Sequence, residues 1–177
     1  MTIPFSSRNS SSSQSQKIGT LGEQLVQAWL KQQGWEILFH QYRCRWGEID
    51  LIAREVKDPK VQSKLDSTVI FVEVKTRSKR NWDSDGLLAI TPNKQAKLIK
   101  SAQTFLSDHP ELADSPCRFD VALVRCDRSL AFNFNSDSKS MAQKPSFPTL
   151  TKGQPIEFRG YQLIIQSYIQ SAFGDNS

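Results

Sequence analysis

The sequence has few residues of the kinds that build zinc sites, disulfide frameworks or histidine-based active sites. It contains three cysteines, an odd number without a Cys-x-x-Cys pair, and two isolated histidines, His40 and His109. No histidine stands at metal-binding spacing, which argues against zinc and against a disulfide framework. We therefore interpret Cys117 and Cys126 as small core residues and assign neither histidine to catalysis.

Long hydrophobic runs are also absent. No apolar stretch approaches the ~20 residues of a membrane span, and the N-terminus has no hydrophobic block of the secretory type. Residues 1–16 are rich in serine, and no acidic residue precedes Glu23. These features resemble a transit peptide, but the segment is poor in arginine. We expect a disordered tail over residues 1–16 in a cytoplasmic protein that has no membrane partner.

The length and charge fit one basic domain. The 177 residues suffice for a single hydrophobic core, and we expect one domain over residues 17–177 with a mobile insertion at about 129–157, which is rich in Ser, Lys and Pro. The net charge of +5 favours a polyanionic partner. Many basic proteins never bind nucleic acid, so the position of the charges matters more than their sum.

Apolar spacing predicts two helices and five strands. The first helix runs from about residue 18 to Gly34, and the second begins at Pro92 and ends before Pro110. The strands are expected at 35–45, 48–54, 68–76, 118–125 and 161–169.

Acidic side chains interrupt two of the most hydrophobic predicted strands. Side chains of a strand alternate between faces, so Glu48 shares a face with Asp50, and Glu73 shares a face with Lys75. A buried charge is costly unless it is paired or bound to a metal, which marks these residues as functional candidates. The opposite faces are apolar and predicted to pack under helices: Ile49, Leu51, Ala53, Ile70, Val72 and Val74.

These residue types are suited to cutting a phosphodiester with a divalent metal. Asp50 and Glu73 are the predicted carboxylate ligands of Mg²⁺ or Mn²⁺, with the carbonyl of Val74 and water completing the shell. Lys75 would orient or deprotonate the attacking water and stabilise charge on the phosphate. An Asp followed by Glu-x-Lys resembles the PD-(D/E)xK nuclease superfamily.

A wider set of motifs closely resembles the YraN-like family of bacterial proteins, over roughly residues 17–126 and again at the last strand. The motifs are Gly19-x-x-Gly22-Glu23, Tyr42-Arg43-Cys44-Arg45-x-Gly47-Glu48-Ile49-Asp50-Leu51-Ile52-Ala53, Phe71-Val72-Glu73-Val74-Lys75-Thr76-Arg77, Lys94-Gln95 and Arg118-Phe119-Asp120-Val121. The sequence departs from the family at Gln41, where Asn is usual, and at Val26, where Ala is common.

The resemblance implies both a fold and an activity. The family is regarded as predicted endonucleases distantly similar to archaeal Holliday junction resolvases. It implies an α/β fold of the restriction-endonuclease-like class, with a mixed sheet of about five strands flanked by helices. It also implies a Mg²⁺-dependent endonuclease acting on DNA, including branched DNA. A junction resolvase would require a homodimer, which the sequence leaves open.

Several residues have two interpretations. In resolvase-like nucleases a glutamate on the first helix joins the metal site, and Glu23 matches it, but Thr20-x-x-Glu23 is also a capping box. We favour the site. Glu48 is either a ligand or a partner of Arg43 or Arg45, and we favour the partner. Arg118 and Asp120 are interpreted as a structural ion pair.

The basic residues near the acids are predicted to contact the phosphate backbone, although such a run is also typical of a solvated strand end. They are Arg43, Arg45, Arg77, Lys79, Arg80 and Lys94. Two further hypotheses compete with the nuclease. One is a non-catalytic nucleic-acid-binding or partner-binding module on the same fold. The other is a purely structural charge network in the sheet, in which Asp50 is needed for folding.

Overall fold

The computed structural model describes residues 9–56, 67–78, 90–129 and 147–174. The elements follow the predicted order, with a short strand added before the last one. Their bounds are α1 Asn9–Gln32, β1 Trp35–Cys44, β2 Gly47–Glu55, β3 Val69–Arg77, α2 Pro92–Asp108, the 3-10 helix η4 Pro110–Leu112, β4 Cys117–Arg128, β5 Ile156–Phe158 and β6 Tyr161–Phe173.

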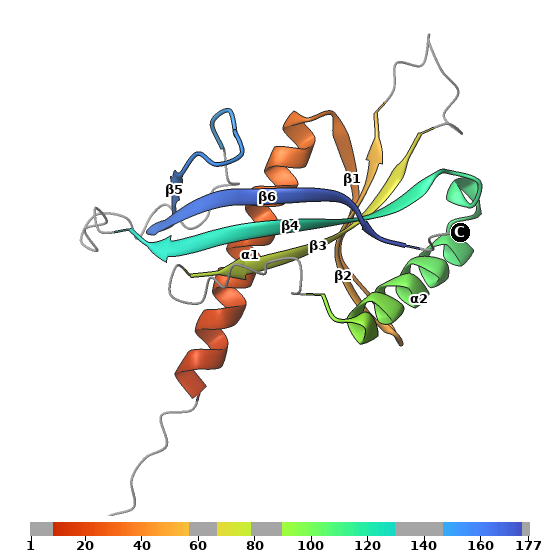
Figure 1. Cartoon of the computed structure of the whole chain (residues 1–177), viewed down its shortest axis with the longest axis horizontal. Coiled ribbons are helices and arrows are strands. Elements are labelled where there is room, and N and C mark those ends of the chain that lie inside the picture. The colour runs from red at the N-terminus through yellow and green to blue at the C-terminus, as the bar shows by residue number, and fades with distance from the viewer. Residues whose placement is uncertain (1–8, 57–66, 79–89, 130–146, 175–177) are drawn as a thin grey trace, which may run out of the picture.

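In the described part of the chain, six strands form one mixed sheet in the order β1-β2-β3-β4-β6-β5 (Figure 1). The central pair, β3 and β4, is parallel, and the other neighbouring pairs are antiparallel. Parallel neighbours need a crossover connection, and the segment between them carries α2. This α/β architecture is consistent with the predicted restriction-endonuclease-like fold. The sheet has six strands because the short β5 pairs with the start of β6.

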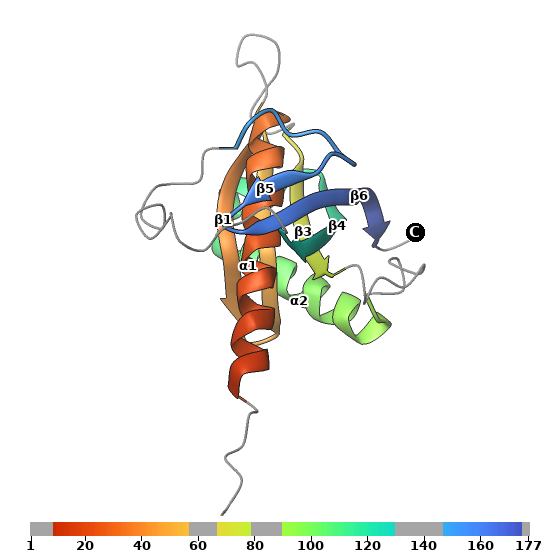
Figure 2. The same ribbon diagram turned by 90° about the vertical axis from the view of Figure 1, so that its left-hand side faces the viewer.

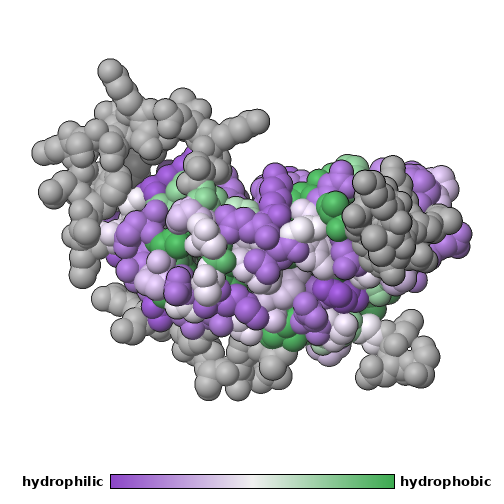
Figure 3. Space-filling model, turned by 90° about the horizontal axis from the view of Figure 1, so that it is seen from above, coloured by the Kyte–Doolittle hydropathy of each residue, from purple (hydrophilic) through white to green (hydrophobic). Residues whose placement is uncertain are grey.

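The two helices cover different sides of the sheet (Figures 1 and 2). The apolar side of α1 packs with Leu51, Val72 and their neighbours, and α2 packs with Phe71 and its neighbours. Seen from above, the described surface is mainly hydrophilic, with apolar side chains in separate small patches (Figure 3). Among the described helices, none is long and apolar enough to span a membrane.

One prediction about the faces of β2 is wrong. Leu51 and Ala53 pack on the α1 side with Ile70, as the alternation predicts, but Ile49 packs on the α2 side. The ladder between β2 and β3 ends at the pair of Leu51 with Val72. Strict alternation is expected along a regular ladder, and the ladder between β2 and β3 ends at Leu51, two residues short of Ile49.

The helix α1 begins earlier than predicted, because residues 9–16 of the expected tail belong to it. Adding turns to a helix that tertiary packing already holds is far easier than nucleating one, so a serine-rich segment can extend it. The hydroxyl of Thr20 donates to the carbonyl of Gln16, inside the helix. Residues 1–8 lie outside the described residues.

The predicted insertion at about 129–157 includes a segment that belongs to the core. Leu150 is buried, and Phe147 packs against Phe158 with ring centres 4.7 Å apart. Gln32 at the end of α1 holds this segment, because its side chain accepts from the Leu150 amide at 2.8 Å and donates to the Pro148 carbonyl at 2.9 Å. Residues 130–146 of the predicted insertion lie outside the described residues.

Candidate functional site

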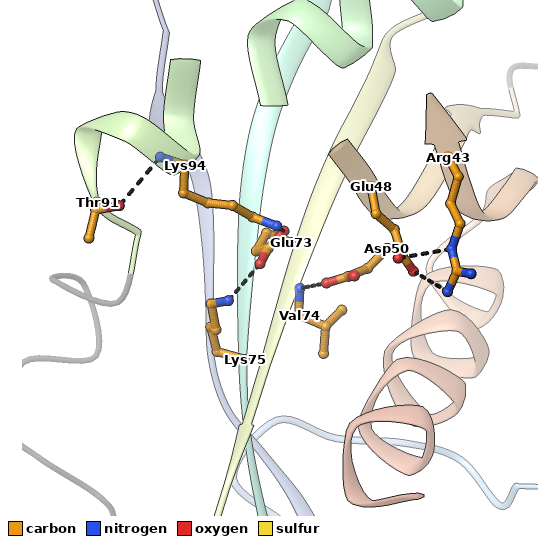
Figure 4. A network of polar contacts seen from close by, with 8 residues as sticks. All are labelled: Arg43, Glu48, Asp50, Glu73, Val74, Lys75, Thr91 and Lys94. Carbon is orange, nitrogen blue, oxygen red and sulfur yellow. Dashed lines mark hydrogen bonds and ion pairs between the residues drawn. The ribbon is translucent and has the colours of Figure 1, made fainter. Parts of the chain in front are cut away.

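Asp50 and Glu73 face one another where β2 and β3 separate. The antiparallel register pairs Leu51 with Val72, so Asp50 and Glu73 would form the next pair, but the ladder has ended. The amide of Val74 instead donates to the Asp50 carboxylate, with 2.7 Å between N and Oδ2 (Figure 4). The site is therefore a fork, formed by Asp50, Glu73 and Val74, in which a side chain has replaced a ladder hydrogen bond.

Glu73 is buried in the fork between two lysines. It is 3% exposed. The ammonium of Lys75 lies 2.6 Å from Glu73 Oε1, and that of Lys94, reaching down from α2, lies 3.2 Å from Oε2 (Figure 4). The Lys94 contact is an ion pair without hydrogen-bond geometry, since the buried Oε2 has no hydrogen-bond partner among the described residues. A metal ion at Oε2 would therefore have to share this oxygen with Lys94 or displace it.

Glu23 approaches the same region from α1, where the helix runs unusually close to β3. A Cβ added to Gly22 would lie 1.9 Å from the Thr76 hydroxyl oxygen, so only glycine allows this approach. Glu23 is buried. The capping-box interpretation is wrong, because Thr20 lies within the helix and donates to Gln16. Glu23 is among the groups that raise the pKa of Asp50, and its role in the site stays a prediction.

Two residues of β1 hold Glu23, and sequence reasoning missed them. Both His40 Nε2, at 3.0 Å, and Gln41 Nε2, at 2.9 Å, contact Glu23 Oε2. Gln41 has a left-handed backbone (φ 55°), which is uncommon for a residue other than glycine and which Asn adopts more readily. The exchange of Asn for Gln at this position was the only sequence signal that pointed here. The irregular backbone explains why alternation alone could not place His40 and Gln41.

Burial and two neighbouring carboxylates make Asp50 hard to ionise. Together, burial, the nearby Glu73 carboxylate and Glu23, in decreasing order of effect, raise the pKa of Asp50 from 3.8 to about 7. The Val74 amide and Lys94 oppose these effects. Near neutral pH Asp50 is therefore close to half-protonated, and a cation bound beside it would restore the charged form.

The donor set fits a magnesium-like ion. In the described part of the chain, no three His, Cys, Asp or Glu side chains converge to form a complete metal cage. Mg²⁺ rarely uses such a cage, because it keeps several waters and binds one or two carboxylates together with phosphate oxygens. Asp50 and Glu73 supply those carboxylates in a buried fork. The carbonyl of Val74 as a further ligand stays a prediction.

The remaining predicted residues separate into four groups. Glu48 pairs with Arg43 at 3.0 Å, which confirms the favoured interpretation of Glu48 (Figure 4). Lys94 lies at Glu73 itself and not at a separate phosphate-binding position. Arg45 is exposed in the turn between β1 and β2, and Arg77 ends β3. Lys79 and Arg80 lie outside the described residues.

The structural ion pair of Arg118 and Asp120 is confirmed. The guanidinium Nε lies 3.0 Å from Asp120 Oδ1, and Asp120 is fully buried. Asp120 also accepts from the Tyr168 hydroxyl at 2.8 Å and from the Ser171 amide at 3.0 Å. Its oxygens are thus satisfied by β4 and β6, away from the fork.

Comparison with known proteins identifies the family. Residues 22–124 match the family model described as "Uncharacterised protein family UPF0102". The chain is 49% identical over 175 residues to a UPF0102 protein of Acaryochloris marina, covering 98% of this chain and 99% of the relative. It is 46% identical over 179 residues to one of Trichodesmium erythraeum (98% and 97% covered) and 43% identical over 157 residues to one of Synechocystis sp. (89% and 97%). The chain belongs to the UPF0102 family.

Proposed function

We propose that this UPF0102 protein is a metal-dependent endonuclease of the PD-(D/E)xK superfamily that acts on DNA, including branched DNA. The proposed cofactor is Mg²⁺ or Mn²⁺. The similarity to archaeal Holliday junction resolvases and the homodimer that a resolvase requires are part of the proposal. The catalytic set consists of Asp50, Glu73, Lys75 and Glu23.

The observation that carries the proposal is the pair of acids in the fork. A half-buried carboxylate with a pKa raised to about 7, beside the buried Glu73 carboxylate, is unfavourable in a structural role. The two acids come from different strands at the point where the ladder ends. This arrangement supports a site for a divalent cation, which would join or displace Lys94 beside the acids.

The chemistry assigns a separate task to each residue. Asp50 and Glu73 would hold the divalent cation, which when bound lowers the pKa of water and neutralises charge on the phosphate. Hydrolysis adds water to phosphorus and releases an alcohol oxygen, so a proton must leave the water and another must reach the leaving oxygen. Lys75, held at 2.6 Å from Glu73, is the group positioned to orient the water. Glu23 would assist from α1, positioned by His40 and Gln41.

The surrounding arginines and lysines would bind the DNA backbone. Such contacts give affinity without reading the base sequence. The proposed contacts are Arg43, Arg45, Arg77, Lys79, Arg80 and Lys94. Arg43 is already paired with Glu48, and Lys94 with Glu73, so the contribution of each should be smaller than that of Arg45.

A second candidate is a binding module without turnover. It is favoured by one observation, namely that Lys75 and Lys94 together already neutralise Glu73. Such a module would bind DNA without needing Asp50, whereas the nuclease needs Asp50 to cut.

The separate tasks of Asp50 and Lys75 can be tested with two variants. Asp50→Asn should abolish Mg²⁺ binding in calorimetric titration and stop cleavage, because it removes a ligand charge and keeps the side-chain shape. Lys75→Ala should reduce cleavage by on the order of 100-fold or more, the loss typical of one electrostatic group in an active site, yet bind Mg²⁺. Lys152→Ala, an exposed lysine far along the chain, is the matched control. Equal Mg²⁺ affinity of the parent and Asp50→Asn would refute the metal site.

A further inference from the structure

The turn between β1 and β2 presents a tryptophan between two cations. Trp46 is one of the most exposed large apolar side chains of the described residues, at 36%. The guanidinium of Arg45 lies 4.8 Å from the centre of its ring, and the ammonium of Lys100 lies 4.5 Å from it. An indole with cations in contact is well suited to bind a planar group attached to an anion.

The turn is fixed on α2 and does not project freely. Cys44 at the end of β1 hydrogen-bonds to the hydroxyl of Ser101, with 3.3 Å between Sγ and Oγ, and Ser101 is fully buried. Gly47 packs beside Lys97 and Ser101, since a Cβ there would lie 3.9 Å from each. Trp46 is therefore held in place by a hairpin and a helix, as a binding residue should be.

The positive charge around Trp46 is unusually uncompensated. The helix α2 carries Lys94, Lys97 and Lys100 and has no acidic residue in its first turn, where the helix dipole favours one. No acidic side chain of the described residues forms an ion pair with Arg45 or Lys100. This surface, which we call the hairpin-tip patch, consists of Arg45, Trp46, Lys97 and Lys100, and its charge is complementary to phosphate.

The hairpin-tip patch is connected to the fork through α2. Lys94 contacts Glu73 in the fork, and Lys100 contacts Trp46. Six residues of helix rise by about 9 Å, so the patch lies within a few nucleotides of the fork along one DNA strand. A strand with its phosphate at the fork can therefore extend along the lysines to Trp46.

We infer that the hairpin-tip patch binds DNA whose bases are unpaired beside the cleavage position, with Trp46 stacking on one base. Arg45, Lys97 and Lys100 contact the phosphates. The two cations at the indole belong to long, flexible side chains. Either of them can therefore move to a phosphate while a base takes its place on the ring. A paired base is already stacked on its neighbours and would first have to be extracted, so the patch selects flaps and single strands over intact duplex. The inference rests on the proposed function and specifies its substrate class.

Binding without metal tests this selection independently of cleavage. With EDTA present, fluorescence anisotropy would compare the full chain on a blunt duplex and on a duplex of equal length with a single-stranded flap. We expect the parent to prefer the flapped DNA and Trp46→Ala to lose about 5- to 100-fold on that DNA alone, the range for one base stacked on an aromatic ring. Trp46→Phe should keep most of the preference. Lys100→Gln should weaken both DNAs alike and reduce the salt slope by about 1.

Arg159→Gln is the matched control, because Arg159 also lies over an aromatic ring, that of Phe158, at 5.1 Å. Arg159→Gln should change neither the affinity for the blunt duplex nor the affinity for the flapped DNA. If Trp46→Ala fails to fold, the fluorescence of Trp46 gives a second measurement. This fluorescence is the difference between the parent and Trp46→Phe, and binding of the flapped DNA should quench it. Equal preference in the parent and Trp46→Ala, or a lower melting temperature with unchanged preference, would overturn the inference. If the parent never cuts DNA but Trp46→Ala still loses the preference for flapped DNA, the nuclease proposal is refuted and the binding role of the hairpin-tip patch stands.

Discussion

The fold disfavours the charged form of Asp50. Burial and Glu73 raise its pKa from 3.8 to about 7. Between these values the folded protein holds a proton that the unfolded chain has lost, so stability falls as the pH rises through this window. The difference corresponds to roughly 4 kcal/mol at most.

Removing this charge should therefore stabilise the metal-free protein. Asp50→Asn is expected to raise the free energy of unfolding at pH 8 by up to about 4 kcal/mol. Near pH 3.5 it should have no effect, because Asp50 is then largely neutral in both the folded and the unfolded parent. The amide oxygen of Asn can still accept from Val74. Thermal or urea denaturation across this pH range, with EDTA present, measures the difference.

The exposed Asp114→Asn serves as a control and should have no such pH dependence. The structural-network hypothesis predicts the opposite sign, because breaking a needed buried pair costs about 3–5 kcal/mol. A strongly destabilised Asp50→Asn at pH 8 would therefore favour that hypothesis.

At the scale of single residues, the sequence could predict the acids but not their supports. Asp50, Glu73 and Lys75 stand out because charges interrupt hydrophobic strands. His40 did not, since its contact with Glu23 spans two elements and depends on the left-handed backbone at Gln41. Lys94 was predicted to bind phosphate, and its ion pair with Glu73 depends on the docking of α2.

At the scale of elements, the contact between α1 and β3 positions Glu23. The helix approaches the strand at Gly22, whose missing side chain leaves room for Thr76. Gly19, one turn earlier on the same helix, has nothing within 4 Å of an added Cβ. The two glycines therefore form a matched pair with opposite expectations.

Gly22→Ala should destabilise the protein by about 1–3 kcal/mol, because an added methyl group forces α1 away from β3. Gly19→Ala should stabilise it by about 0.5–1 kcal/mol, the gain from replacing glycine within a helix. Thermal denaturation of both variants provides the measurement. Equal melting temperatures for the two would contradict the close approach, and the double variant Gly22→Ala with Thr76→Gly should recover part of the loss.

The order and type of the main elements followed from apolar spacing, but two boundaries did not. The serine-rich start of α1 has no apolar period, so its helical state depends on the packed turns that follow. The segment around Leu150 lies between Pro148 and Pro155, which hide any strand or helix period. Its buried position depends on Gln32, more than 100 residues earlier.

At the scale of the whole molecule, the fold brings the two charge signs together. The acids lie in the fork of the sheet, and the lysines of α2 extend from it toward the hairpin-tip patch. The net charge of +5 favours a polyanionic partner, and this arrangement concentrates the positive charge beside the acids. Such an arrangement could not be read from composition, because it depends on α2 crossing above the fork.

The central claim is that the fork cuts DNA with a divalent metal, and a cleavage screen tests it most directly. Single-stranded, duplex, flapped and four-way DNA of matched length would be incubated with Mg²⁺, Mn²⁺ or EDTA and either the parent or Asp50→Asn. If the fork is a metal-dependent nuclease site, the parent should cut at least the DNA with unpaired bases, only with metal, and Asp50→Asn should bind the same DNA without cutting it. A parent that cuts none of these with either metal, or an Asp50→Asn variant that cuts as fast as the parent, would contradict it.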